Sequence, residues 1–141
     1  MKASKKIKIC DWSLLAVMIL ILASSIQLEA TGSRSVVSVW LHIGAGIIFA
    51  ILIWWHIHLH SAWSKWRQKL VGRHGLKWLS IFGALLLVSA IAATAHWLPT
   101  GIHSTIGGVH GKIGFLFVLA CTIHAIKHGK FYTNRKPSSQ V

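Results

Sequence analysis

The chain has 141 residues, of which 54% are apolar and only 12% are charged, so its composition excludes an ordinary soluble domain and indicates an integral membrane protein. The formal net charge of +13 would suit nucleic-acid binding only in a soluble domain with groove-reading or base-stacking elements, and the sequence offers none. We therefore expect the lipid bilayer as a partner and no nucleic acid.

Four apolar runs, nearly free of charged residues, are each about as long as the twenty residues that span a bilayer core. They cover residues 12–30, 36–60, 76–98 and 102–126. Because the connections between them are short, we predict a single domain, residues 1–141, folded as an all-α, up-down-up-down four-helix membrane bundle. The first run resembles a signal peptide but has a poor cleavage pattern, so we expect it to be retained as a helix.

The basic residues are distributed unevenly over this four-span topology. Thirteen of the fifteen fall on one side, and only Arg34 and Lys112 fall toward the other. This positive-inside pattern predicts that both termini lie in the cytoplasm, and we expect the membrane to be a bacterial inner membrane. Cys10 and Cys121 are both expected toward the cytoplasmic half, where a structural disulfide is not expected.

The second and fourth spans each carry two histidines fourteen residues apart, His42 with His56 and His110 with His124. At about 100° per residue, the two histidines of each pair are rotated about the helix axis by only about 40° from one another and lie about 21 Å apart along it. They therefore share one face of the helix. Both spans run in the same direction, so His42 is level with His110, and His56 with His124. Facing imidazoles at two depths predict two non-covalent, six-coordinate b haems between these helices.

Two glycines and two cations accompany the histidine pairs. Gly46 and Gly114 each follow the first histidine of their span by four residues, and each removes a side chain where a porphyrin edge would need room. Arg34 and Lys112 lie on the expected outer side, where they would pair with haem propionates. Snorkelling of both side chains to the lipid head groups is an equally good explanation.

Other histidines leave alternatives open. His60 and His128 follow His56 and His124 by four residues and share their faces, so they are the alternative inner ligands. His96 and His103 flank the expected outer turn, where they would bind a quinone head group, accept a proton or form interfacial hydrogen bonds.

With these residues in place, the chain resembles the transmembrane di-haem cytochrome b superfamily over nearly its whole length. The fourteen-residue spacing is similar to that of the cytochrome b subunit of quinol:cytochrome c oxidoreductases, reduced to a four-helix core. Residues 110–128 also resemble the last helix of small bacterial four-helix b-type cytochromes, although those proteins take one ligand from a first helix that here has no histidine. The resemblance implies four axial ligands, His42, His110, His56 and His124.

The function that we expect is transmembrane electron transfer, because six-coordinate haems have no open position for a substrate. The expected partners are a membrane quinone or quinol and another redox protein or subunit, since the loops are too short to hold a flavin or iron–sulfur domain. Two alternatives stay open. One is a quinone-coupled oxidoreductase that acts on superoxide or a metal ion at the outer face through His96, His103 and Lys112, and the other is a haem-free metal transporter or sensor. An electron-transfer component is favoured over a stand-alone enzyme.

Overall fold

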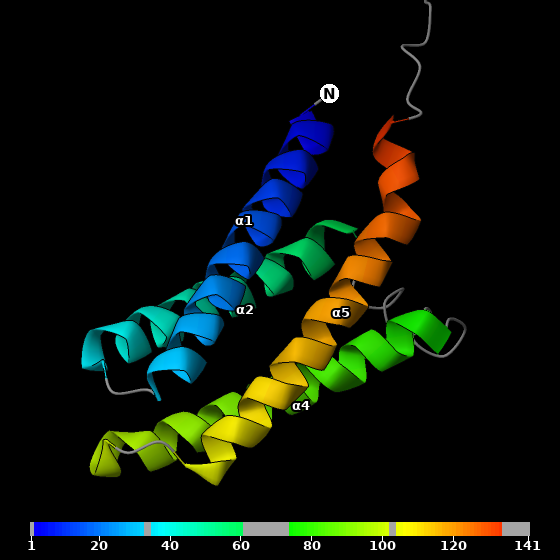
Figure 1. The fold of residues 1–141 in the computed structure, drawn as a ribbon. Coiled ribbons are helices and arrows are strands. Elements are labelled where there is room, and N and C mark those ends of the chain that lie inside the picture. The colour runs from blue at the N-terminus through cyan, green and yellow to red at the C-terminus, as the bar shows by residue number, and fades with distance from the viewer. Residues whose placement is uncertain (1, 33–34, 61–73, 102–103, 134–141) are drawn as a thin grey trace, which may run out of the picture.

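The computed structural model is all-helical and consists of two helical hairpins (Figure 1). The first hairpin joins α1 (Lys2–Thr31) to α2 (Val36–His60), and the second joins α4 (His74–Thr100) to α5 (Thr105–Thr133). The structure describes residues 2–32, 35–60, 74–101 and 104–133, and within them the side chains of 5–32, 35–60, 77–101 and 104–127.

All four helices are long and apolar enough to cross a membrane, as predicted. The candidate spans are Lys5–Thr31, Val36–His60, Lys77–Thr100 and Thr105–Lys127. Large apolar side chains point outward along every helix, among them Ile19, Ile51, Val88 and Ile126. Apolar surface of this extent would be costly in water, whereas lipid tails solvate it, so the helices are suited to direct contact with the bilayer.

Three helices extend beyond the predicted spans. α1 begins at Lys2 instead of residue 12, α4 begins at His74, and α5 continues to Thr133. The segment before residue 12 contains neither proline nor glycine and is rich in lysine, which is a good helix former. The charged residues therefore indicate where each apolar run begins or ends, but the helices continue past them.

The two hairpin turns share two features. Gly32 and Gly101 each follow the last helical residue with a positive φ, 58° and 61°, which is the left-handed conformation that commonly ends a helix. Three residues later, the hydroxyl groups of Ser35 and Ser104 accept hydrogen bonds from the backbone N–H groups of Ser38 and Gly107, at 3.3 and 3.2 Å. Both turns thus share the pattern Thr-Gly-x-x-Ser.

Close backbone packing occurs within each hairpin, α1 on α2 and α4 on α5. The two hairpins contact each other through aromatic and imidazole rings. Trp40 of α2 packs edge to face on Trp97 of α4, with ring centroids 5.9 Å apart. We call the end of the molecule that holds the two turns the turn end, and the opposite end, with Lys2 and Thr133, the terminal end (Figure 1).

Candidate functional site

Near the turn end, the imidazole rings of His42 from α2 and His110 from α5 face each other across the two hairpins. Their centroids are 6.2 Å apart and their planes are inclined by 79°. Both side chains are half-buried. The structure therefore brings together two histidines that are distant in the sequence and that were predicted to lie level with one another.

A serine of the neighbouring helix fixes the orientation of His42. The Ser24 hydroxyl of α1 donates to the carbonyl oxygen of Ile21 at 2.8 Å, so its proton is committed to the backbone. The same oxygen lies 2.8 Å from His42 Nδ1 and is left to accept a hydrogen bond. With the Ser24 proton on the Ile21 carbonyl oxygen, His42 carries its proton on Nδ1, and its lone pair is then on Nε2.

The second hairpin repeats this arrangement. The Ser89 hydroxyl of α4 donates to the Leu86 carbonyl oxygen at 2.9 Å and lies 3.1 Å from His110 Nδ1. With the Ser89 proton on the Leu86 carbonyl oxygen, His110 also carries its proton on Nδ1 and has its lone pair on Nε2. Histidines that bind a metal usually donate their other ring N–H to a fixed acceptor, and this acceptor raises their basicity. In this tautomer, each ring could offer its Nε2 lone pair to a metal.

The spacing of the two rings also suits a shared metal ion. Two imidazoles on opposite sides of one ion, each with a metal–nitrogen bond of about 2 Å, have ring centres on the order of 6 Å apart. A Cβ atom built on Gly46, one turn after His42, would meet nothing within 4 Å, so this side of α2 has room beside the pair. A Cβ on Gly114 would lie 3.5 Å from Leu86 Cδ1, so Gly114 packs against α4. The distance between the two rings thus suits one shared metal ion, and α2 is uncovered at Gly46 beside His42.

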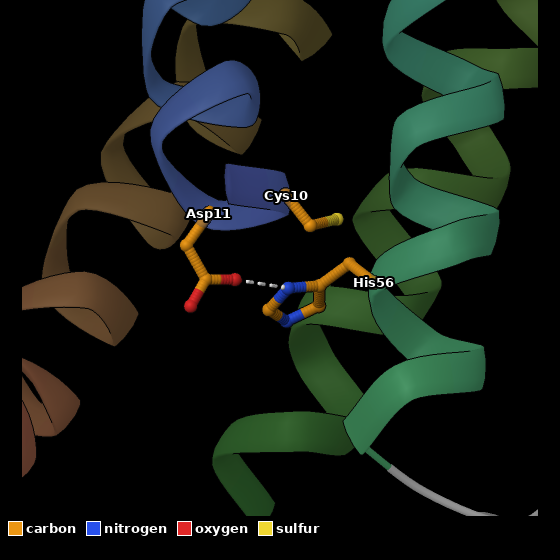
Figure 2. Close-up of side chains that lie close together, drawn as sticks. All are labelled: Cys10, Asp11 and His56. Carbon is orange, nitrogen blue, oxygen red and sulfur yellow. Dashed lines mark hydrogen bonds and ion pairs between the residues drawn. The ribbon is translucent and has the colours of Figure 1, made fainter. Parts of the chain in front are cut away.

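At the terminal end, His56 is bound to a carboxylate. Its Nδ1 lies 2.8 Å from Asp11 Oδ1 of α1 (Figure 2). The same oxygen is 3.5 Å from His60 Nε2, and the rings of His56 and His60 have centroids 4.4 Å apart. Because the carboxylate is an acceptor, His56 also carries its proton on Nδ1 and has its Nε2 lone pair available. His60 belongs to this cluster through Asp11.

Cys10 forms, with Asp11 and His56, a second group of side chains that could bind a metal ion. The ligand atoms of Cys10, Asp11 and His56 all lie within 4.8 Å of one another (Figure 2). Cys10 is fully buried and is a free thiol, with its Sγ 3.8 Å from the Leu52 carbonyl oxygen. A thiol, a carboxylate and an imidazole are a donor set that zinc accepts. This group is a metal-ion candidate and has no resemblance to a haem site.

The remaining predicted site residues are placed less specifically. His124 is half-buried in α5, fourteen residues after His110 and therefore on nearly the same face. Lys112 is exposed, and it lies about 200° around the helix from His110, which favours the lipid head-group explanation for its charge. His96 is exposed near the end of α4. Arg34, His103 and the side chain of His128 lie outside the described residues.

Sequence reasoning missed three residues that contact the histidines, Ser24, Ser89 and Asp11. The two serines gave no signal, since serine is common in membrane helices and also bonds to its own helix. Asp11 could have been found from the sequence, because it is one of only two acidic residues in the chain and lies inside a candidate span. An ionisable residue in such a position is a functional candidate by default.

Comparison of the chain with protein-family models, with curated proteins and with solved structures finds no significant match. The functional argument therefore depends on the geometry of the His42–His110 pair.

Proposed function

We propose that the protein is a membrane-embedded b-type cytochrome that transfers electrons across the bilayer. The observation that carries the proposal is the His42–His110 pair, whose rings meet across the hairpins with centroids 6.2 Å apart. Each ring is bonded at Nδ1 to a serine hydroxyl, which leaves both Nε2 atoms free to bind iron.

In this proposal His42 and His110 hold one haem, and His56 and His124 hold a second. When bound, haem supplies one-electron chemistry, and with two histidine ligands on the iron it has no open coordination position. The chain supplies the rest. Ser24 and Ser89 orient the first pair, Asp11 orients His56, and the lipid-facing apolar side chains keep water away from both sites.

The membrane context of the proposal follows from charge. Among the residues that the structure describes, Lys5, Lys6, Lys8, Lys77 and Lys127 lie toward the terminal end, so we propose that this end faces the cytoplasm and that the membrane is a bacterial inner membrane. The partners are a membrane quinone or quinol and a second redox protein or subunit. The likeness to the transmembrane di-haem cytochrome b superfamily is part of this proposal and supports it through the spacing of the four histidines.

The test is the absorbance spectrum of the full-length protein, purified in detergent from cells supplied with haem precursor. We expect a reduced-minus-oxidised spectrum of low-spin b haem and about two haems per chain. His42→Ala and His110→Ala should each lose the same spectral component, and His56→Ala and His124→Ala the other. His58→Ala is the matched control, because His58 is exposed on the same helix as His42. A helical, haem-supplied protein without haem absorbance would contradict the proposal.

A second candidate is a haem-free metal protein, a transporter or sensor. The observation that favours it is the Cys10–Asp11–His56 group, whose ligand atoms are close enough to share one ion. Elemental analysis separates the two candidates. Zinc or copper bound at one ion per chain, lost from both Cys10→Ala and Asp11→Asn and accompanied by no iron, would support the second and exclude the first.

A further inference from the structure

We infer that the terminal end of the first hairpin binds one divalent metal ion of the zinc class. Its ligands are the side chains of Cys10 and Asp11 from α1 and of His56 and His60 from α2. The inference goes beyond the proposed function and, unlike the second candidate, leaves the His42–His110 pair to haem, because the two sites use different residues. Since an ion and a haem cannot share His56, a chain that holds the ion has no second haem.

Helix geometry places the four donors side by side. Cys10 and Asp11 are neighbours in α1, and His56 and His60 are one turn apart on a single face of α2. The two helices pack closely along the first hairpin. The ligand atoms of Cys10, Asp11 and His56 lie within 4.8 Å of one another (Figure 2). His60 is next to this group, with its Nε2 atom 3.5 Å from Asp11 Oδ1.

The distances need little adjustment to hold an ion. In a tetrahedral zinc site with bonds of about 2.0–2.3 Å, neighbouring ligand atoms are roughly 3.3–3.7 Å apart. Asp11 Oδ1 and His56 Nδ1 are 2.8 Å apart, so an ion that replaces the proton between them moves them apart by on the order of 0.5 Å. That proton then moves to Nε2, and the His56 ring stays neutral. The Cys10 sulfur gives up only a long contact with the Leu52 carbonyl oxygen, at 3.8 Å.

Charge balance favours a dication in this position. Asp11 lies inside a candidate span and is only 22% exposed, and Cys10 is fully buried. An isolated charge is costly in such surroundings. One dication with one carboxylate, one thiolate and neutral imidazoles has a total charge of zero, and its binding releases the thiol proton. The ion therefore neutralises Asp11 and makes the thiolate of Cys10 compatible with burial.

The donor types select the class of ion. Thiolate and imidazole bind zinc and similar transition metals, whereas magnesium and calcium require several oxygen ligands, and Asp11 is the one carboxylate in this group. Both acidic residues of the chain, Asp11 and Glu29, lie in α1. Cys121 of α5 therefore belongs to a hairpin without a carboxylate, and it is the natural control for Cys10.

The experiment uses Co²⁺ as a spectroscopic probe for zinc in the haem-free, full-length protein in detergent. A cobalt–thiolate bond gives a charge-transfer band in the near ultraviolet, and tetrahedral coordination gives intense visible bands. In Cys121→Ser, where Cys10 is the only cysteine, we expect both signals to saturate at one cobalt per chain. Zn²⁺ should displace the cobalt, and Mg²⁺ should not. This variant leaves all four ligands unchanged, so the test does not depend on a substitution within the site.

Substitution of the ligands then assigns them. Cys10→Ser should abolish the charge-transfer band. Loss of an outer partner alone typically costs about 10–100-fold in metal affinity, so loss of a ligand in Asp11→Asn, His56→Gln or His60→Gln should weaken binding by more than about tenfold. The matched controls are Glu29→Gln and His58→Gln, which change the same residue types outside the group and should bind cobalt as wild type does.

The outcomes separate this inference from the proposed function. A Cys121→Ser protein that is helical by circular dichroism but shows no cobalt–thiolate band overturns the inference, as does unchanged cobalt affinity in Asp11→Asn or His56→Gln. Unchanged affinity in His60→Gln overturns the assignment of the fourth ligand. Haem absorbance at the His42–His110 pair is measured separately, so its absence contradicts the proposed function and leaves the metal site standing.

Discussion

Phe49 of α2 and Phe117 of α5 pack edge to face, with ring centroids 6.2 Å apart and planes inclined by 85°. Each phenylalanine lies seven residues after the first histidine of its helix, about 10 Å further along the axis and halfway to the second histidine. The same faces of α2 and α5 thus meet at a histidine level and again at an apolar aromatic layer below it. Along α2, this layer lies between the His42–His110 pair and His56.

Gly83 of α4 tests how tightly the aromatic layer is packed. A Cβ atom at this position would lie 3.2 Å from Phe117 Cε2, and Phe117 is only 4% exposed and already packed on Phe49. We expect Gly83→Ala to lower the free energy of unfolding by about 1 kcal/mol, since overpacking typically costs about 1–3 kcal/mol and the gain in helix propensity offsets part of it. Unfolding of the haem-free protein in detergent, followed by circular dichroism, measures this.

The matched control is Gly114→Ala, whose Cβ would lie at an ordinary contact distance of 3.5 Å from Leu86 Cδ1. We expect it to be neutral or slightly stabilising in the same assay. Equal stability of the two variants would show that Phe117 can move and that the layer is loosely packed.

Ser24 and Ser89 should contribute similarly to the haem affinity of one site, the His42–His110 pair. Ser24→Ala and Ser89→Ala each remove the acceptor that fixes an Nδ1–H, and loss of such a partner typically lowers metal affinity by about 10–100-fold. We expect each variant to weaken the same haem component by this order, measured by titrating haem into the haem-free protein. Ser25→Ala, the neighbouring position on α1, is the control. If the two serine variants affect different components, the pairing of His42 with His110 is wrong.

Trp97 offers a prediction about stability alone. Its indole Nε1 is buried and has no hydrogen-bond partner among the described residues, while its ring packs on Trp40. Leaving a buried donor unpaired costs about 1–3 kcal/mol, and phenylalanine keeps the aromatic contact without the N–H group. Trp97→Phe should therefore be at least as stable as wild type in the haem-free state, whereas Trp97→Ala should be clearly less stable. A marked loss of stability in Trp97→Phe would mean that the N–H group has a partner.

The periodicity of the sequence was sufficient to predict the four helices and the facing of His42 and His110. Both depend on composition and spacing within one helix. The two histidines also follow their turns at nearly equal distances, His42 ten residues after Gly32 and His110 nine after Gly101. The contacts of Asp11, Ser24 and Ser89 could not be predicted in this way. They depend on the register between α1 and α2 and between α4 and α5, which is set by side-chain packing across each hairpin.

One signal for that register was present in the sequence. The pattern Thr-Gly-x-x-Ser at 31–35 and again at 100–104 marks two turns that share a left-handed glycine and a serine before the next helix. A repeated turn predicts that the second helix of each hairpin returns along the first, but it does not fix which residues meet. Ser24 and Ser89 lie seven and eleven residues before these turns' threonines, and this difference shows why an exact contact still required the structure.

Gly46 allows a test of the space beside His42. A Cβ atom there meets nothing within 4 Å, and the position lies one turn after His42 on the face toward α5. We expect Gly46→Phe to fold normally by circular dichroism but to lose the haem component that His42→Ala also loses, because the ring would occupy the room beside the histidine pair. Gly44→Phe is the matched control. Gly44 is equally free of neighbours within 4 Å but lies about 200° around the helix from His42, so its variant should keep both haems. Retention of two haems by Gly46→Phe would mean that no planar cofactor lies on this face of α2.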